Sequence, residues 1–408
     1  MGRRFLQGVS PSDLQVDGPL FTWYRRYAQR HVRPAHVAVI GDSIAFGSGT
    51  AVGTTPDVTN YLNTMIIQLQ RMLNELPSYY LRQDEAMAGS YNPSPGGGYC
   101  VPTRLQGQGI ADPWRVAAGT VTSISRGMGL RSLQINAASR LAFTAPSASG
   151  FLWWYEDGAS NLGTPAVSIY AGDYNATRTG RLVDNFAMTM NTGLAQYTRT
   201  FSGSIQLPGR GKWTIEFSPT SGTPVLDMLY VLDGDLGNGV QVYNLAFGSQ
   251  LSGDFAANNT AANTSALAAT KLQAFAADGI DLLVIYLGAN DYSNNINPTT
   301  FQTNLETIID KYRAAQTRTI PVLLVGHFAR YDQTTPTFPW YQYLAAMRAV
   351  TQTRTMTDFL DLRPVFPASQ AADTDGDLVD SSGVHLSAAG QGVAAQMIAS
   401  RLSFPGVV

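Results

Sequence analysis

The sequence predicts an α/β protein in which a three-layer parallel sheet is interrupted by an all-β insert. Residues 281–287 (DLLVIYL) form a near-continuous apolar run, which is expected of a parallel strand covered on both faces. Strand-like and helix-like segments alternate between residues 239 and 402, which favours a parallel sheet between helices. Residues 112–232 instead carry short alternating runs separated by Gly, Asn, Asp, Ser and Pro, at a spacing typical of a β-sandwich.

The first predicted elements are a short helix, a strand, a covering helix and a loop. Residues 1–34 predict a short helix near 21–30, within a segment that is either a lead-in packed on the body or an attachment segment. The β-branched run at 36–40 (HVAVI) predicts the first strand, and the apolar spacing over 59–76 predicts a helix that covers it. The Pro- and Gly-rich residues 91–109 predict a loop.

The later elements follow the same two patterns. In the insert we expect strands at 150–155, 166–170, 195–201, 213–217 and 225–231. Trp153, Trp154 and Tyr155 are interpreted as core residues, with a sugar-stacking platform as the alternative. After the insert we expect strands at 239–243, 281–287, 320–325 and 359–362, and helices at 265–277, 301–312, 340–350 and 387–402.

Composition excludes several classes of function. The net charge of −2 gives no electrostatic footprint for nucleic acid, so we expect no nucleic-acid partner. A single cysteine, Cys100, excludes an intrachain disulfide, and with only four histidines a metal site is not expected. No run reaches the roughly 18 apolar residues of a membrane span, and the basic start continues into no apolar signal region. We therefore expect a soluble protein without signal peptide.

The residues that carry chemistry follow the predicted strands. Ser43 directly follows the first strand, in a Gly-Asp-Ser turn, while Gly248 and Asn290 follow two later strands and His385 precedes the last helix. The carboxyl ends of parallel strands meet at one edge of a sheet, so these residues are expected to converge. A serine hydroxyl becomes an effective nucleophile when a base such as His385 takes its proton. The backbone N–H groups of Ser43 and Gly248 and the amide of Asn290 would stabilise the oxyanion that forms.

These blocks resemble the SGNH (GDSL-type) hydrolase family. The matching blocks are Gly41-Asp42-Ser43, Gly248, Gly288-Ala289-Asn290-Asp291 and His385-Leu386, in the order of the family and spread over residues 36–76 and 239–402. The resemblance implies a flavodoxin-like three-layer sheet and a cofactor-free serine esterase. It does not extend to the β insert.

The chain departs from the family at one position. Ser382 stands three residues before His385, where the family usually has an Asp. Asp380 could supply the carboxylate if the loop bulges, or a backbone carbonyl could orient the imidazole and give a Ser–His dyad. Asp291 and His327 are expected to line the substrate site, with a structural hydrogen-bonded histidine as an equal alternative for His327.

The expected organisation has three parts. Residues 1–35 form the lead-in or attachment segment, residues 36–111 and 236–408 form the hydrolase domain, and residues 112–235 form a jelly-roll-like, carbohydrate-binding-like sandwich. Because the insert enters between the first two strands of the sheet, we expect it to overhang the site. This favours a bulky substrate, such as an O-acetylated polysaccharide or cell-surface glycan.

Two other functions stay open at this point. The first is a lipase or thioesterase acting on acyl chains, and the second is a non-catalytic receptor-binding tail protein with a degenerate SGNH fold. The Ser/Thr/Asn/Gly-rich, Lys-poor composition is similar in style to SGNH domains of bacteriophage tail proteins. That similarity implies virion or tail assembly partners and action at the host surface; otherwise the protein is expected to be cytoplasmic.

Overall fold

The computed structural model describes most of the hydrolase-like part and much of the insert. The described residues are 18–30, 34–47, 64–74, 98–102, 114–124, 132–157, 163–187, 198–201, 205–232, 239–246, 248–257, 279–314, 316, 318–333, 335–373, 378–380 and 382–403. The helix expected at 265–277 lies outside them.

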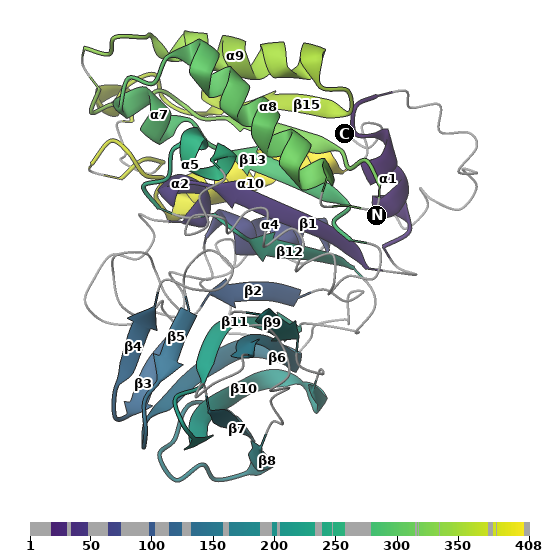
Figure 1. The fold of residues 1–408 in the computed structure, drawn as a ribbon, viewed down its shortest axis with the longest axis vertical. Helices are drawn as coiled ribbons and strands as arrows, with labels where there is room; N and C mark the ends of the chain where they lie inside the picture. The colour runs from purple at the N-terminus through teal and green to yellow at the C-terminus, as the bar shows by residue number, and fades with distance from the viewer. Residues whose placement is uncertain are drawn as a thin grey trace.

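A five-stranded parallel sheet forms the upper part of the molecule in Figure 1, as predicted. Its order is β15 (Thr357–Asp361), β14 (Val322–Gly326), β13 (Leu282–Tyr286), β1 (Ala35–Gly41) and β12 (Val240–Asn244). β1 therefore lies between β13 and β12, with Gly41 opposite Tyr286 and Val39 opposite Asn244. This order places the segments that follow β12, β1 and β13 side by side at the carboxyl edge of the sheet.

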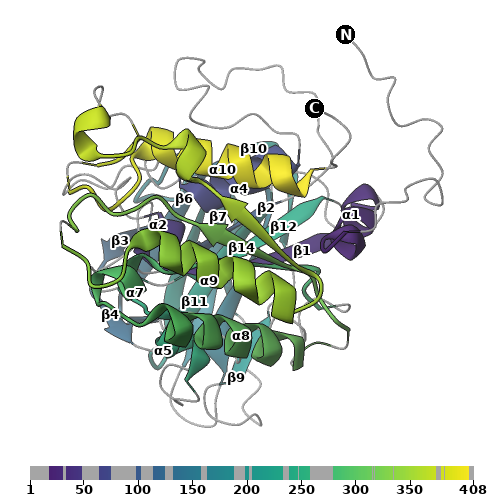
Figure 2. The same cartoon turned by 90° about the horizontal axis from the view of Figure 1, so that it is seen from above.

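Helices cover both faces of the sheet (Figure 2). On one face α8 (Pro298–Ala314) and α9 (Trp340–Thr353) pack over inward residues such as Ala38 and Ile40 of β1. On the other face α4 (Met65–Leu73) and α10 (Ala388–Leu402) pack over Val37 and Val39. Alternate residues of a strand point to opposite faces, so a continuously apolar strand supplies two cores at once.

The lead-in helix α1 (Phe21–Ala28) packs on the body of the molecule. Trp23 is fully buried and its indole N–H donates to the carbonyl oxygen of Leu402 at 2.9 Å. The hydroxyl of Tyr27 donates to the carbonyl oxygen of Leu73 at 3.1 Å. The described part of this segment is thus tied to the ends of α10 and α4, and the choice between a lead-in and an attachment segment stays a prediction.

The insert is antiparallel and all-β, as predicted, and lies in the lower part of Figure 1. Its strands are β3 (Trp114–Ala118), β4 (Val121–Ile124), β5 (Ser132–Ile135), β6 (Arg140–Asp157), β7 (Thr164–Ala171), β8 (Arg181–Ala187), β9 (Thr198–Phe201), β10 (Ile205–Ser221) and β11 (Val225–Leu232). β6 pairs with β3 near its start and with β10 from Leu141 to Phe151, and its later residues pair with β11 and β9. The shared strand thus joins two groups of strands around one apolar core.

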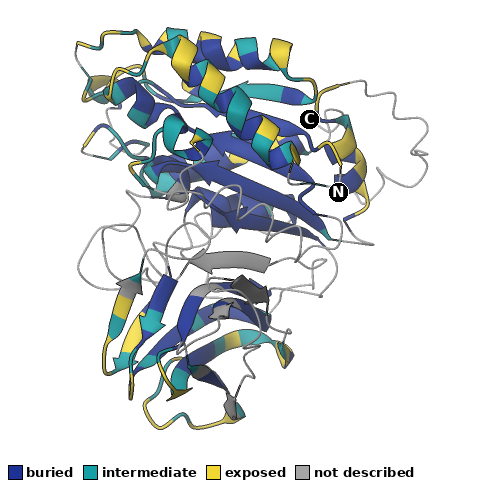
Figure 3. Cartoon of the chain, viewed as in Figure 1, coloured by how far each residue is buried: buried dark blue, intermediate teal, exposed yellow. Residues whose placement is uncertain are grey.

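The core of the insert is aromatic and closely packed. Trp153 and Phe217 meet edge to face, with ring centroids 5.4 Å apart, and both are buried. Trp114 packs on Phe143 from the opposite strand of the pair. Trp153 and Tyr155 are buried, which agrees with their interpretation as core residues, while the side chain of Trp154 lies outside the described residues. Figure 3 shows the buried stretches of the insert strands in dark blue.

The loop predicted at 91–109 is wrong for one part of it. Residues Gly98–Pro102 form strand β2, which pairs in parallel with β12 and antiparallel with β11. A strand edge on each side supplies hydrogen-bond partners that outweigh the turn-forming composition around it. β2 joins the parallel sheet to the insert, while the domain limits at 111/112 and 235/236 stay a prediction.

Candidate active site

Ser43 lies at the start of a tight strand-to-helix turn. It is the first residue of α2 (Ser43–Phe46), directly after β1 and Asp42. Asp42 caps this helix, since its carboxylate accepts the N–H of Ile44 at 2.9 Å. A side chain at Gly41 would come within 2.6 Å of the carbonyl oxygen of Tyr286, so only glycine allows β1 and β13 to approach this closely before the turn.

His385 reaches Ser43 from the far end of the chain. Its Nε2 lies 3.0 Å from the hydroxyl oxygen of Ser43. His385 belongs to the loop before α10, and a bridge between Val379 and Leu386 holds the two sides of this loop together. The predicted encounter of serine and histidine is therefore present in the structure, in hydrogen-bond geometry.

Asp380 lies next to the imidazole in the same loop. Its Oδ2 lies 3.6 Å from Nδ1 of His385, which is ion-pair distance and longer than a hydrogen bond. Its Oδ1 accepts the hydroxyl of Ser382 at 2.5 Å and the backbone N–H of His385 at 3.3 Å. Ser382, at the position of the family's Asp, thus donates to Asp380. The loop turns back on itself, since the N–H of Gly383 donates to the carbonyl oxygen of Asp380 at 3.0 Å and the N–H of Asp380 donates to that of His385 at 2.8 Å, and this turn places Asp380 beside the imidazole.

The surroundings of His385 keep its imidazole neutral at neutral pH. Burial lowers its pKa below the ordinary value, the nearby charge of Asp380 opposes this, and the guanidinium of Arg330 lowers the pKa further. A neutral imidazole can accept the proton of Ser43. The pair is therefore poised for general-base chemistry.

Asn290 and Gly248 stand on either side of Ser43. Asn290 lies in α7 (Ala289–Ser293), after β13, and Gly248 lies in the turn after β12, so the two flank the segment that follows β1. The side-chain amide of Asn290 donates to the carbonyl oxygen of Gln250 at 3.1 Å, which ties the two loops together. An Asn amide has a second N–H, which this hydrogen bond leaves unused.

Asp291 does not line the site, and its expected position is corrected. The residue is 0% exposed, and its carboxylate accepts both the N–H and the hydroxyl of Ser252, the latter at 2.6 Å. Asn304 in turn donates to that hydroxyl at 2.9 Å. Asp291 therefore anchors the short helix α5 (Ser252–Ala256) and, with it, the loop that carries Gly248.

For His327, one of the two alternatives fits its position in the structure. It follows β14 and is 1% exposed, which excludes a surface position. Its Nδ1 lies 3.3 Å from the hydroxyl of Tyr286, and its carbonyl oxygen accepts the indole N–H of Trp340 at 2.8 Å. The alternative of a structural, hydrogen-bonded histidine is the one that the geometry favours.

Sequence reasoning missed the buried supports of the site. Gln391 is fully buried, its amide donates to the carbonyl oxygen of Ile44, and its oxygen accepts the N–H of Met65 at 2.9 Å. It thereby joins α10 to α2 and α4 directly behind Ser43. A polar residue among the small inward residues of α10 was the signal that could have identified it.

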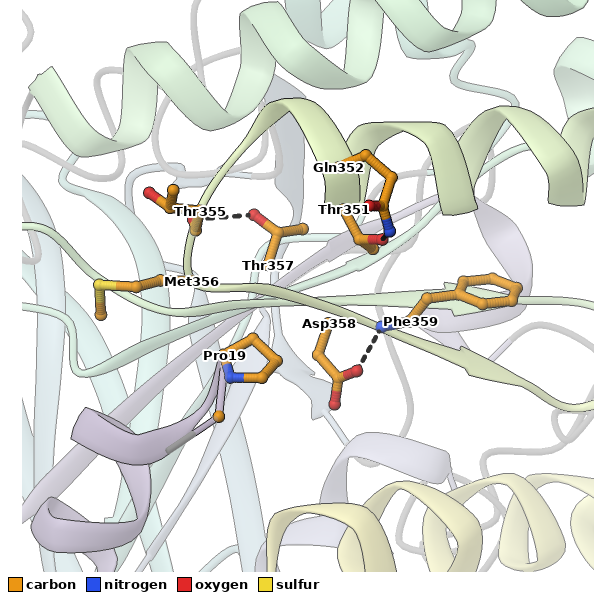
Figure 4. A pocket seen from close by; sticks show the side chains of 9 residues that line it. Pro19, Thr351, Gln352, Thr355, Met356, Thr357, Asp358 and Phe359 are labelled. Atoms are coloured by element: carbon orange, nitrogen blue, oxygen red, sulfur yellow. Dashed lines mark hydrogen bonds between the residues drawn. The ribbon is translucent and has the colours of Figure 1, made fainter. Parts of the chain in front are cut away.

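An open cavity of about 500 Å³ lies elsewhere, between the end of α9, the start of β15 and Pro19 (Figure 4). Thr357 and Asp358, which line it, begin β15. The cavity is thus at the amino end of a parallel strand, whereas Ser43 and Asn290 follow carboxyl ends. The cavity therefore lies at the opposite edge of the sheet from the candidate site.

The described residues show neither a metal site nor a membrane span. No three His, Cys, Asp or Glu side chains within the described ranges gather in an arrangement that could hold a metal ion. Within the same ranges, no helix combines the length and the apolar character needed to cross a membrane.

A five-stranded parallel sheet between helices, joined to an antiparallel insert, is the SGNH hydrolase fold with an added β unit. Residues 221–393 match the model of the GDSL-like Lipase/Acylhydrolase family. That match contains Gly248, Asn290 and His385, covers less than half of the chain and does not reach Ser43. The α/β part is accordingly SGNH/GDSL-like.

Solved structures give a likeness in fold. The chain is similar to one described as "Peptidoglycan O-acetylesterase in action, 5 min", with 16% identity, a TM-score of 0.62 and 96% of each chain covered. It is less similar to a family two carbohydrate esterase from Cellvibrio japonicus, with 11% identity, 75% of this chain and 97% of that chain covered, and a TM-score of 0.32. No curated protein matches. At these identities the likeness concerns the fold alone, and in the first case it extends over the insert.

Proposed function

We propose that this protein is a serine esterase that hydrolyses carboxylic esters through an acyl-enzyme. The observation that carries the proposal is the 3.0 Å hydrogen bond between Nε2 of His385 and the hydroxyl of Ser43. A serine paired with a neutral histidine at the carboxyl edge of a parallel sheet is the arrangement that acyl transfer requires.

The steps follow from the positions of the side chains. His385 takes the proton of Ser43 while the serine oxygen attacks the ester carbonyl, and the imidazolium then gives the proton to the leaving alcohol. The backbone N–H groups of Ser43 and Gly248 and the free amide N–H of Asn290 stabilise the oxyanion. Water then attacks the acyl-enzyme by the same route, with His385 again as base. Asp380 stabilises the imidazolium across 3.6 Å.

We further propose O-acetyl groups of a polysaccharide or cell-surface glycan as the substrate. A peptidoglycan O-acetylesterase shares this fold over 96% of both chains, which supports an acetylated glycan. In both cartoon views β3 and β4 of the insert lie on the same side of the molecule as α2 and α7 (Figures 1 and 2). An insert on the side of the site favours a large substrate over a free acyl chain. Association with a phage tail stays a prediction from composition.

The test compares wild type with Ser43→Ala. We expect p-nitrophenyl acetate to be hydrolysed faster than p-nitrophenyl octanoate, acetate to be released from an acetylated glycan, and both activities to be lost in the variant. Faster octanoate turnover would instead favour the lipase alternative. Folded wild-type protein that hydrolyses no ester would contradict the proposal.

A further inference from the structure

His327 is a buried histidine beside the candidate site whose place in the chemistry is unassigned. Its ring packs against Tyr286 and Phe328, with centroids 5.7 and 3.9 Å away. Its Nδ1 meets the Tyr286 hydroxyl, but its Nε2 is buried and has no partner in standard hydrogen-bond geometry among the described residues. A buried ring nitrogen in this state calls for an explanation.

The segment that begins with His327 contacts the loop that carries His385. The backbone N–H of Tyr331 donates to the carbonyl oxygen of Gly383 at 2.9 Å. Gly383 itself has φ +69°, a conformation that fits glycine, and it lies against the side chain of Tyr331. The loop of His385 is thus hydrogen-bonded, two residues before His385, to the segment that follows β14.

Val384 is the next residue of that loop, and its peptide oxygen acts on the His327 ring. Burial lowers the pKa of His327 to about 3, the Val384 oxygen opposes this, and the charges of Arg330 and His385 lower the pKa again. His327 is therefore neutral throughout the working pH range and carries one ring hydrogen. A Tyr286 hydroxyl that donates to Nδ1 places this hydrogen on Nε2, and this tautomer is part of the proposal.

We propose that His327 is a positioning residue, whose Nε2–H is directed at the Val384 carbonyl and holds His385 within reach of Ser43. This inference rests on the proposed function. The main reason for it is the distance of 3.6 Å between Oδ2 of Asp380 and Nδ1 of His385. A carboxylate at that distance orients the imidazole less strictly than a short hydrogen bond, so the backbone on either side of His385 must fix it.

The chain offers a matched control in His36. This histidine is also buried, and its Nδ1 lies 3.0 Å from the hydroxyl of Tyr243. It lies near the amino end of β1, at the opposite end of the strand from Ser43. Substitution of His36 therefore reports the loss of a buried histidine–tyrosine contact without a change at the site.

The experiment compares His327→Gln, His327→Asn and His36→Asn. The amide nitrogen of Gln takes the place of Nε2, whereas that of Asn takes the place of Nδ1. For p-nitrophenyl acetate we expect kcat to fall at least about 10-fold in His327→Asn and to stay within about 3-fold of wild type in His327→Gln, with KM unchanged in both. His36→Asn keeps the wild-type kcat per folded molecule. Equal losses in Gln and Asn, a change in KM alone, or an equal loss in His36→Asn would overturn the proposal.

A second measurement does not depend on turnover. In ¹H–¹⁵N spectra of the ring nitrogens, assigned by loss of signals in His327→Gln, we expect the Nε2–H tautomer without titration between pH 5 and 9. The His385 ring signals should shift in His327→Asn and not in His327→Gln. An Nδ1–H tautomer, or unshifted His385 signals, refutes the positioning role. An inactive wild type with the expected signals would refute the esterase function and leave the positioning role standing.

Discussion

The charge of Asp380 provides the sharpest test of how the candidate site works. Asp380→Asn removes the charge and keeps an oxygen that can accept from Ser382 and from the backbone of His385, so the loop is retained. The variant therefore asks whether a carboxylate 3.6 Å from Nδ1 contributes to catalysis when it is not hydrogen-bonded to the ring. In the SGNH family, the carboxylate beside the histidine usually comes from an Asp three residues before it, where this chain has Ser382.

The expected loss follows from the distance and the exposure. Two unit charges 3.6 Å apart attract by about 1.2 kcal/mol in bulk water and by about 4.6 kcal/mol at the effective dielectric constant near a protein surface. The side chains of His385 and Asp380 are 27% and 23% exposed, which places the pair between these limits. We expect the imidazolium formed in the transition state to lose about 2 kcal/mol, a fall of about 30-fold in kcat.

The assay measures kcat for p-nitrophenyl acetate in Asp380→Asn and in Ser382→Ala. The second variant removes a hydroxyl that donates to Asp380 but keeps the charge, so we expect its kcat to fall less than about 3-fold. The two variants differ in the charge near His385. Equal rates in both would refute the role of that charge.

The pH dependence of kcat/KM tests the role of Asp380 independently, through the direction in which the acid limb moves. The charge of Asp380 raises the pKa of His385, against the larger effect of burial. Removal of the charge lowers that pKa further, so His385 stays neutral to lower pH. The acid limb of kcat/KM is therefore expected to move to lower pH in Asp380→Asn, although the plateau is lower. A shift to higher pH would contradict the assignment of His385 as the titrating base.

Two further predictions concern buried charges. Burial raises the pKa of Asp42 to about 7, so the folded state retains a proton that the unfolded chain releases, and stability falls as pH rises from about 4 to 7. Asp42→Asn should remove about 2 kcal/mol of the decrease in unfolding free energy between pH 5 and 8, measured by urea denaturation; parallel pH curves would contradict this. In the insert, Arg178 lies 2.9 Å from Glu216, whose side chain is 1% exposed, so Arg178→Ala should lower the unfolding free energy by about 3 kcal/mol. Lys212→Ala, at an exposed pair with Asp173, should cost less than about 1 kcal/mol, and similar losses in both variants would count against the buried pair.

The fold was predictable where a strand is buried on both faces, because such a strand is apolar at every position. The apolar runs became β13 and β14, buried at every position, because helices cover both faces. The short strands β3, β4, β5 and β8 were missed, as was β2. β8, with the sequence RLVDNFA, is interrupted by Asp184 and Asn185 and pairs with β7 along its edge. Such pairing depends on a partner that is distant in sequence, which local composition does not encode.

For the candidate site, the sequence predicted which serine and histidine meet but not which group orients the histidine. The motifs placed Ser43 and His385 at the edge of the sheet, and the structure brings them to 3.0 Å. The choice between Asp380 and a backbone carbonyl stayed open because it depends on the turn of one loop. The turn that places Asp380 is held by its contacts with Ser382 and with the backbone of His385, which the spacing of residues in the sequence does not reveal.

Asp291 was wrongly expected to line the site, and His327 takes the structural one of its two alternatives, for the same physical reason. Asn290 and Asp291 are neighbours after β13, yet one faces the loop of Gly248 and the other is buried beneath it against Ser252. His327 likewise follows β14 and points inward to Tyr286. A motif fixes how close a residue lies to the edge of the sheet, but successive side chains leave the backbone in different directions. Residues after parallel strands therefore divide into those that face the substrate and those that hold the loops. Asp291 holds the loop of Gly248, and His327 lies against the loop of His385.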